Sequence, residues 1–361
     1  MDTQNPEVRT CTWAAARNRK GAWLKLPVLP SPRGVGRGFG YFFFRVRIGA
    51  AILILAGTIP ASSQAAGQND TNFRVGFTSS MFTDVNENDA KASIKVWSQT
   101  IAKERGIPIN PDAMIIKDTP ALLQALRDKA VDAVGITIPE YAAACQEVRL
   151  SPLFVTYTSG WMREEYLLLV HKDSQIEHLE DLRGKTLSFY QQPRTCLAQP
   201  WLDTLLVQNV GRATAEFLGK ITQARQISKA VLPVFFRQSD ACVATRAGFE
   251  TMCELNPQVG HQLKIIACSP ELVTVVLCFR ADYSSVFKQD LLASLRELHT
   301  TAAGRQVLTV FGSDKLEEQP ASCLASALEL LDRNARLAGR AGASKGREPG
   351  ELPQSFGGIN P

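Results

Sequence analysis

The chain has 361 residues, of which 45% are hydrophobic and 21% charged, with 25 Gly and 19 Pro. This is ordinary globular usage, and it excludes a collagen, a coiled coil and a chain that is disordered throughout. The formal charge of +5 comes from the first 47 residues, where nine Lys and Arg against two acidic residues give +7, so that residues 67–361 sum to −2. A nucleic-acid-binding protein carries its positive charge on the folded domain, so that function is disfavoured.

Residues 1–66 are interpreted as a basic leader and secretion signal. An uncharged apolar run extends from Ile48 to Ile59, and Ser63–Ala65 supplies the small residues that a signal peptidase recognises. The run is shorter than the roughly 20 apolar residues of a membrane-spanning helix. An uncleaved anchor is the alternative, because Phe42–Phe44 adds apolar bulk upstream. The sequence therefore predicts export to the periplasm, with cleavage favoured over a membrane anchor.

The next segment alternates between apolar strands and helices. Strands are predicted at Phe73–Thr78, Ala113–Ile116 and Val131–Ile136. The first helix begins at Asn88 or Asp89, the second has Thr119 as its N-cap followed by Pro, and the third opens at Pro139. Strands that alternate with helices through short links predict a parallel sheet covered by helices.

The same alternation continues further along the chain. Strands are predicted at Tyr166–Val170, within Leu179–Phe189 after a helical turn, and at Ala241–Ala244, Ile265–Ile266 and Val273–Phe279. Helices are predicted at Thr195–Val207, Ser228–Arg237, Val286–Thr300, Gly304–Phe311 and Ala321–Leu337.

Two segments, Tyr166–Ser174 and Val275–Ser284, share one order: an apolar strand, a basic residue, an Asp and a Ser. They indicate a chain that leaves one lobe, builds a second and returns. We therefore assign residues 67–168 to the first part of lobe 1, 169–271 to lobe 2, and 272–337 to the return part of lobe 1. Residues 338–361 are rich in Gly and charge with hardly any apolar residue, which predicts a disordered tail.

Motifs for metal, cofactor or catalysis are not found in the sequence. The eight cysteines show no Cys-x-x-Cys spacing and the four histidines are scattered, so neither a zinc site nor a cofactor is predicted. There is no Gly-x-Ser-x-Gly, His-Glu-x-x-His or phosphate-binding loop. His171, near the end of a predicted strand, is better explained as a hydrogen-bonding residue than as a catalytic one. We therefore predict a protein that is not an enzyme.

Four segments carry a resemblance to a known family. Leu179–Phe189, with the sequence LEDLRGKTLSF, resembles the segment that opens the second lobe of type 2 periplasmic solute-binding proteins, and Asp132–Ile136 resembles the first-lobe strand that meets their ligand. Ser228–Val231 and Ser239–Thr245 resemble the helix and strand of their second lobe. Taken in order, Phe73–Asn334 is similar to the phosphate, phosphite and phosphonate-binding proteins of ABC importers.

The resemblance implies an α/β fold of two lobes, each a mainly parallel sheet flanked by helices and joined by two crossover strands. It implies a monomer without a cofactor that captures a small phosphate- or phosphonate-like oxyanion between the lobes and delivers it to an ABC permease. Two alternatives remain. The protein could signal to a membrane sensor kinase instead of a permease, or it could bind a small organic ligand without phosphorus.

The candidate ligand-binding residues all lie at strand ends or helix starts, where open α/β sheets bind ligands. They are Thr78, Ser79, Ser80, Thr137, Tyr141, Tyr190, Arg194, Thr195, Ser228, Asp240 and Thr245. Thr195 best matches the family's Ser/Thr-rich turn, so its hydroxyl is expected to donate to a phosphoryl oxygen. Arg194 either binds the anion through its fork of donors or is a solvated surface charge.

The other candidates have structural alternatives. Thr78, Ser79 and Ser80 could form an ordinary turn, and Tyr141 could belong to the core rather than to the wall of the cleft. Asp240 matches a position that contacts the amine of aminophosphonates in some relatives, but it could equally be a turn residue. Ser228 stands where relatives often have a His that grips the phosphonate. Tyr190 is placed to stack on a ligand.

Overall fold

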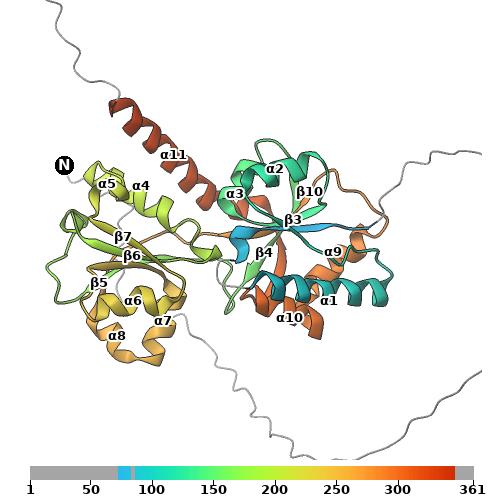
Figure 1. Ribbon diagram of the computed structural model, residues 1–361, viewed down its shortest axis with the longest axis horizontal. Helices are drawn as coiled ribbons and strands as arrows, with labels where there is room; N and C mark the ends of the chain where they lie inside the picture. Colours follow the sequence, from blue (N-terminus) through green and yellow to red (C-terminus); the bar gives the residue numbers. More distant parts are fainter. Residues whose placement is uncertain (1–71, 83–85, 346–361) are drawn as a thin grey trace, which may run out of the picture. The chain divides into compact units, whose positions relative to one another are not determined.

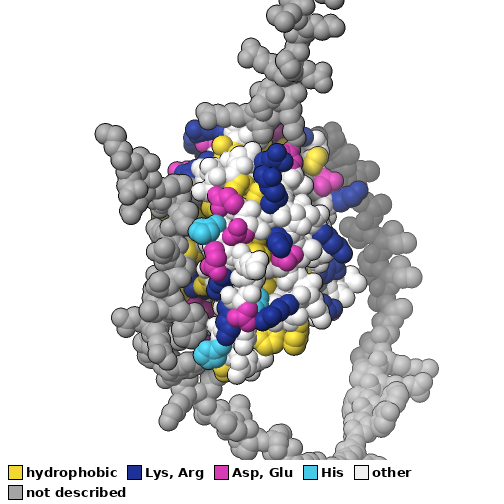
Figure 2. All heavy atoms as spheres, turned by 90° about the vertical axis from the view of Figure 1, so that its left-hand side faces the viewer, with side chains coloured by type: hydrophobic (Ala, Val, Ile, Leu, Met, Phe, Trp, Pro, Cys, Tyr) yellow, Lys and Arg dark blue, Asp and Glu magenta, His cyan; other side chains and the backbone are white. Residues whose placement is uncertain are grey.

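A computed structural model describes residues 72–82 and 86–345, all of which belong to one compact unit with two β-sheets (Figure 1). The predicted leader and secretion signal in residues 1–66 lie outside the described residues. Among the helices of the described part, none is long and apolar enough to cross a membrane. On the face shown in Figure 2, the described residues intersperse basic and acidic side chains.

The first sheet has six strands in the order β11-β4-β10-β3-β1-β2. Their bounds are β1 Val75–Thr78, β2 Met114–Ile116, β3 Ala133–Thr137, β4 Leu150–Tyr157, β10 Val275–Arg280 and β11 Lys315–Gln319. β1 pairs in parallel with β2 and β3, as the alternation of strands and helices predicts. β10 pairs antiparallel with β3 and β4, and β11 with β4, so the sheet is mixed rather than mainly parallel. The antiparallel strands lie outside the predicted βαβ units.

The second sheet has five strands in the order β7-β6-β8-β5-β9. Their bounds are β5 Tyr166–His171, β6 Thr186–Tyr190, β7 Lys220–Ala224, β8 Ala241–Thr245 and β9 Leu263–Cys268. β6 pairs in parallel with β7 and β8, whereas β5 pairs antiparallel with β8 and β9. This sheet is therefore mixed as well, since the strand that enters it runs against its neighbours.

Eleven α-helices are present in the described residues. They are α1 Glu87–Arg105, α2 Thr119–Arg127, α3 Ile138–Ala144, α4 Ala198–Val210, α5 Thr214–Phe217, α6 Ile227–Phe235, α7 Arg246–Leu255, α8 Pro257–Gln262, α9 Lys288–Arg296, α10 Ala302–Val310 and α11 Ala325–Lys345. The Asp118 side chain accepts a hydrogen bond from the Ala121 N–H, so the N-cap of α2 is Asp118 and not Thr119.

The last helix continues past Leu337 to Lys345, so the prediction of a disordered tail is wrong for residues 338–345. Arg333 pairs with Glu329, and Arg336 with Asp332, each at the i,i+4 spacing that supports a helix. The Ala-rich sequence that follows has high helix propensity, which a count of apolar residues does not detect. Residues 346–361 lie outside the described residues.

Two segments connect the sheets, from β4 to β5 and from β9 back to β10. They lie side by side where Glu164 and Leu272 exchange two backbone hydrogen bonds of 2.8 Å. Helix α11 adds a third connection, because it packs against both α3 and α4, and the Asn334 amide donates to the Pro200 carbonyl at 3.2 Å. The two sheets are thus held together by the two connecting segments and by the packing of α11.

Hydrophobic side chains cover both faces of the first sheet. Helices α2, α3 and α11 pack on one face, and α1, α9 and α10 on the other (Figure 1). The hydrophobic cluster between the sheet and α1, α9 and α10 includes Phe73, Trp97, Leu295 and Leu308, all of which are buried. This face, under α1 and α10, is the one that borders the cavity described below.

Candidate functional site

Hydroxyl groups from the ends of β1 and β3 meet at one carboxylate, that of Glu140 in the first turn of α3. Thr78 Oγ1 donates to Glu140 Oε2 and Ser80 Oγ to Glu140 Oε1, both at 2.8 Å. Thr137, the N-cap of α3, donates to Glu140 Oε2 from its backbone N at 2.9 Å and its Oγ1 at 2.8 Å. Three of the candidate residues are therefore brought together, but they already bind an anion that belongs to the chain itself.

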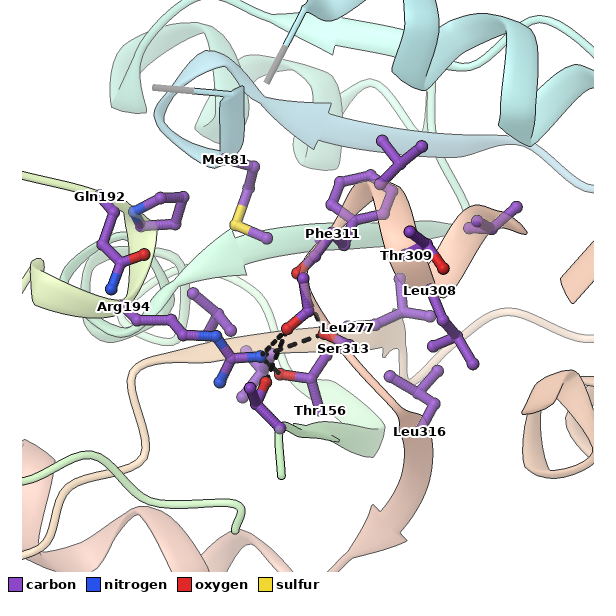
Figure 3. A pocket seen from close by; sticks show the side chains of 18 of the residues that line it. Met81, Thr156, Gln192, Arg194, Leu277, Leu308, Thr309, Phe311, Ser313 and Leu316 are labelled. Atoms are coloured by element: carbon purple, nitrogen blue, oxygen red, sulfur yellow. Dashed lines mark hydrogen bonds between the residues drawn. The ribbon is translucent and has the colours of Figure 1, made fainter. Parts of the chain in front are cut away.

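Arg194 lies in the turn after β6 and is buried, with 9% of its surface exposed. Its Nη1 pairs with Glu164 Oε1 at 3.3 Å. Its Nη2 donates to Thr156 Oγ1 at 3.2 Å, to Ser313 Oγ at 3.1 Å and to the Gly312 carbonyl at 3.4 Å (Figure 3). A guanidinium from the second sheet is thus held by groups of the first sheet and of the connecting segment, and it is not a solvated surface charge.

Burial governs the protonation of the groups around this pair. Burial raises the pKa of the Glu164 carboxyl, and the Arg194 cation opposes that rise. Burial also raises the pKa of the Tyr166 phenol, which donates to the Arg194 carbonyl at 2.8 Å. The net charge of the Arg194–Glu164 pair therefore depends on the proton of Glu164, and the pair is positive when that carboxyl is protonated.

One cavity of about 520 Å³ contains this pair. Its polar wall includes Thr156, Glu164, Tyr190, Arg194 and Thr245. Figure 3 shows Arg194 directed toward Thr156 and Ser313, with Leu308 and Leu316 on the other side of these two residues. The cavity therefore joins a charged region to an apolar one.

The remaining candidates lie in several different places. Tyr190 and Thr245 border the cavity together with Arg194, and Thr245 also accepts a hydrogen bond from the Gly248 N–H as the N-cap of α7. Ser79 is exposed and donates to the Lys117 carbonyl at 2.6 Å. Thr195 donates to the Gln192 carbonyl and accepts from the Gln192 N–H, both at 2.9 Å, so its hydroxyl closes its own turn.

Three further candidates have local structural roles or lie apart. Tyr141 is buried in the hydrophobic cluster under α2, α3 and α11. Asp240 lies before β8, at the opposite end from Thr245, and accepts from the Thr186 N–H and hydroxyl at 2.8 Å. Ser228 is half-buried in the first turn of α6.

His171 is buried at the end of β5, where its Nδ1 accepts from the Asp173 N–H at 3.1 Å and burial lowers its pKa. Its hydrogen bonding agrees with the role expected from the sequence. Within residues 72–82 and 86–345, no group of His, Cys, Asp and Glu is arranged to hold a metal ion.

Sequence reasoning missed Glu140, Glu164, Thr156 and Ser313. The spacing Thr137-x-x-Glu140 is that of a capping box, so a signal for Glu140 was present in the sequence. The other three become neighbours of Arg194 only through contacts between distant segments. A local pattern therefore could not have identified them.

Residues 80–322 match the family described as periplasmic substrate-binding proteins of phosphonate ABC transporters. XAC2383 from Xanthomonas citri, solved with ATP bound, is similar in structure with a TM-score of 0.56 and 16% identity, over 74% of this chain and 98% of that one. PhnD1 from Prochlorococcus marinus, in complex with methylphosphonate, has a TM-score of 0.51 and 13% identity, over 75% and 100%. The sequence matches none of the curated proteins compared with it. The expected family and two-lobed α/β fold are confirmed.

Proposed function

The chain belongs to the periplasmic substrate-binding family of phosphonate ABC transporters, and we propose that it binds an anionic, phosphonate-like solute beside Arg194 and delivers it to an ABC permease. Members of this family are substrate-binding transport proteins and not enzymes. The family match supports a phosphonate-like ligand, and the cavity beside Arg194 supports the position at which that ligand binds. The division into residues 67–168, 169–271 and 272–337, and export through the leader, belong to the same proposal.

The observation that carries the proposal is the buried guanidinium of Arg194 on the wall of the cavity. Arginine presents a planar fork of donors that matches the oxygens of a phosphonate, and such charge-assisted hydrogen bonds are strong away from water. The same side chain contacts Thr156 and Ser313 of the first sheet. An anion bound here would therefore touch both sheets and favour their closed arrangement.

The hydroxyls of Thr78, Ser80 and Thr137 are less suitable for the ligand than the resemblance implies. They already donate to the Glu140 carboxylate. A second anion at this place would meet the like charge of Glu140, whereas at Arg194 the guanidinium itself supplies the positive charge that offsets Glu164. We therefore place the anionic group at Arg194, with Tyr190 and Thr245 as further ligand contacts.

Binding is tested by calorimetry and thermal unfolding of the mature protein with methylphosphonate, 2-aminoethylphosphonate, phosphite, phosphate, sulfate and amino acids. At a ligand concentration 100 times Kd, binding adds about 2.7 kcal/mol to the free energy of unfolding. The double variant Arg194→Gln, Glu164→Gln removes the cation without leaving a buried carboxylate unpaired, and we expect it to lose affinity at least tenfold. Arg237→Gln, which removes an exposed charge, is the control.

The proposal fails if no anion of the panel binds, or if the double variant binds as tightly as the wild type. Delivery is tested by deleting the gene and growing the cells on the identified phosphonate as sole phosphorus source. A transport protein predicts loss of growth on the phosphonate and normal growth on phosphate. If the deletion strain grows normally on both the phosphonate and phosphate but loses a transcriptional response to the ligand, the proposed partner is a sensor kinase and not a permease.

A further inference from the structure

The cavity continues from Arg194 into an apolar chamber between the first sheet and helices α1, α9 and α10. We define the apolar chamber by Phe77, Ile94, Trp97, Leu298, Val307 and Leu308, which line the same cavity as Arg194. Except for Phe77, which is half-buried, their side chains are buried. The total volume of about 520 Å³ falls in the range of sites that hold drug-sized molecules. A single phosphonate headgroup would leave most of this volume empty.

A glycine in β3 helps to shape the apolar chamber. A Cβ atom at Gly135 would lie 2.4 Å from the Phe77 ring, so only glycine lets this ring lie against the strand. The Phe77 ring stacks on Phe311, with centroids 5.1 Å apart and planes at 22°. Two stacked aromatic rings therefore form a flat apolar part of the cavity lining.

The apolar chamber also contains a hydrogen-bond donor without a partner. Trp97 is 5% exposed, and its Nε1–H makes no hydrogen bond within the described part of the chain. Buried N–H groups are nearly always satisfied, so this one is unusual. The nitrogen itself has almost no accessible surface, so Trp97 borders the cavity through the apolar part of its indole ring.

We propose that the ligand is an amphiphilic anion whose charged headgroup binds Arg194 and whose apolar body fills the apolar chamber. An alkyl- or arylphosphonate with a chain of several carbons meets this description, and methylphosphonate does not. The choice of phosphonate as headgroup rests on the proposed function, whereas the apolar body rests on the apolar chamber alone. Hydrophobic burial makes each added methylene favourable, by roughly fourfold in Kd.

The test is a homologous series of methyl-, butyl-, hexyl-, octyl- and phenylphosphonate, with Kd measured by calorimetry on the full-length mature protein. We expect Kd to fall about fourfold per methylene until the apolar chamber is full. Val307→Phe, which fills the chamber, should retain the affinity for methylphosphonate and lose the dependence on chain length. Val286→Phe is the matched control, because Val286 is 89% exposed.

If Val307→Phe does not fold, Ile94→Phe places a phenyl ring in the chamber from α1, adds less volume, and should also weaken the dependence on chain length. A Kd that is constant along the series in the wild-type protein overturns the proposal, and so does unchanged chain-length dependence in folded chamber variants. The same series is measured with alkylsulfonates and alkylcarboxylates. If these bind with chain-length dependence while no phosphonate binds, the apolar chamber stands and the phosphonate headgroup of the proposed function fails.

Discussion

Glu140 occupies the place where the sequence predicts a bound ligand, beside the hydroxyls of Thr78, Ser80 and Thr137. Its carboxylate accepts from two hydroxyls, one at the end of β1 and one just after it, and from the Thr137 N-cap of α3, so the positive end of that helix already has an anionic partner. The sequence pattern correctly brings hydroxyls to the strand ends. What Thr78 and Ser80 bind depends on a contact with α3, more than 50 residues away, and could not be predicted locally.

We expect Glu140→Ala to turn the hydroxyl cluster into a site for a small oxyanion. Removing the carboxylate leaves the donors of Thr78, Ser80 and Thr137 without their acceptor, which costs about 1–3 kcal/mol of stability. Sulfate should restore part of this loss, because its oxygens can accept the same hydrogen bonds. The measurement is thermal unfolding in sulfate against chloride at equal ionic strength. Glu140→Gln, which retains an acceptor, is the control, and equal sulfate effects in Glu140→Ala and the wild type would contradict the interpretation.

Glu164 should make anion binding depend on pH. Because burial raises its pKa, Glu164 takes up a proton above the pH range of an ordinary carboxyl, and Arg194 then loses its counter-charge. Affinity for an anion should therefore increase as the pH falls through the raised pKa of Glu164 toward the ordinary Glu value of about 4. An alkylsulfonate, whose charge is constant in this range, is the probe for Kd. Glu164→Gln should bind more tightly and without this pH dependence.

The same proton also contributes to stability. A carboxyl with a raised pKa in the folded state binds its proton more readily there than in the unfolded chain. Its favourable contribution is complete below the unfolded-state pKa and is lost as the pH rises through the raised pKa of folded Glu164. The free energy of unfolding of Glu164→Gln should thus depend less on pH than that of the wild type, and identical pH profiles would contradict the assignment.

At the scale of elements, the predictions succeed where hydrophobic periodicity is strong. β1, β3, β5 and β8 are buried strands, and all four are expected from the sequence, as is the partly exposed β2. The three missed strands each lack such a signal. β4 contains Pro152, which argues against a strand, β7 is largely exposed, and β11 has the charged sequence KLEEQ. These strands are defined by their pairing partners rather than by their own composition.

Helix α10 supplies Val307 and Leu308 to the apolar chamber, and its position depends on one glycine. A Cβ atom at Gly304 would lie 1.9 Å from the Leu298 carbonyl oxygen, so Gly304→Ala forces the helix away from its neighbour. We expect this variant to lose about 1–3 kcal/mol of stability. Gly339→Ala in α11 is the matched control, since open space surrounds that position, and it should gain up to about 1 kcal/mol. Urea unfolding measures both, and equal effects would contradict the argument.

At the scale of the whole molecule, the sequence predicts a chain that leaves one sheet and returns to it, and the observed strand order agrees. The sequence does not predict how the two sheets make contact near the site. Arg194 reaches from the turn after β6 to β4 and to the turn before β11. A ligand at Arg194 would therefore stabilise segments of both sheets together.

This coupling predicts a pattern of hydrogen exchange. At a ligand concentration 100 times Kd, amides that exchange only when the ligand has left should slow by up to about 100-fold, which corresponds to about 2.7 kcal/mol. We expect slower exchange around Gln192–Arg194, which follow β6 of the second sheet, and also around Thr156 in β4 and Ser313 before β11 of the first sheet. In the double variant Arg194→Gln, Glu164→Gln, both regions should lose this protection. Protection confined to one sheet would mean that the ligand binds one lobe alone, and it would contradict a site shared by the two sheets.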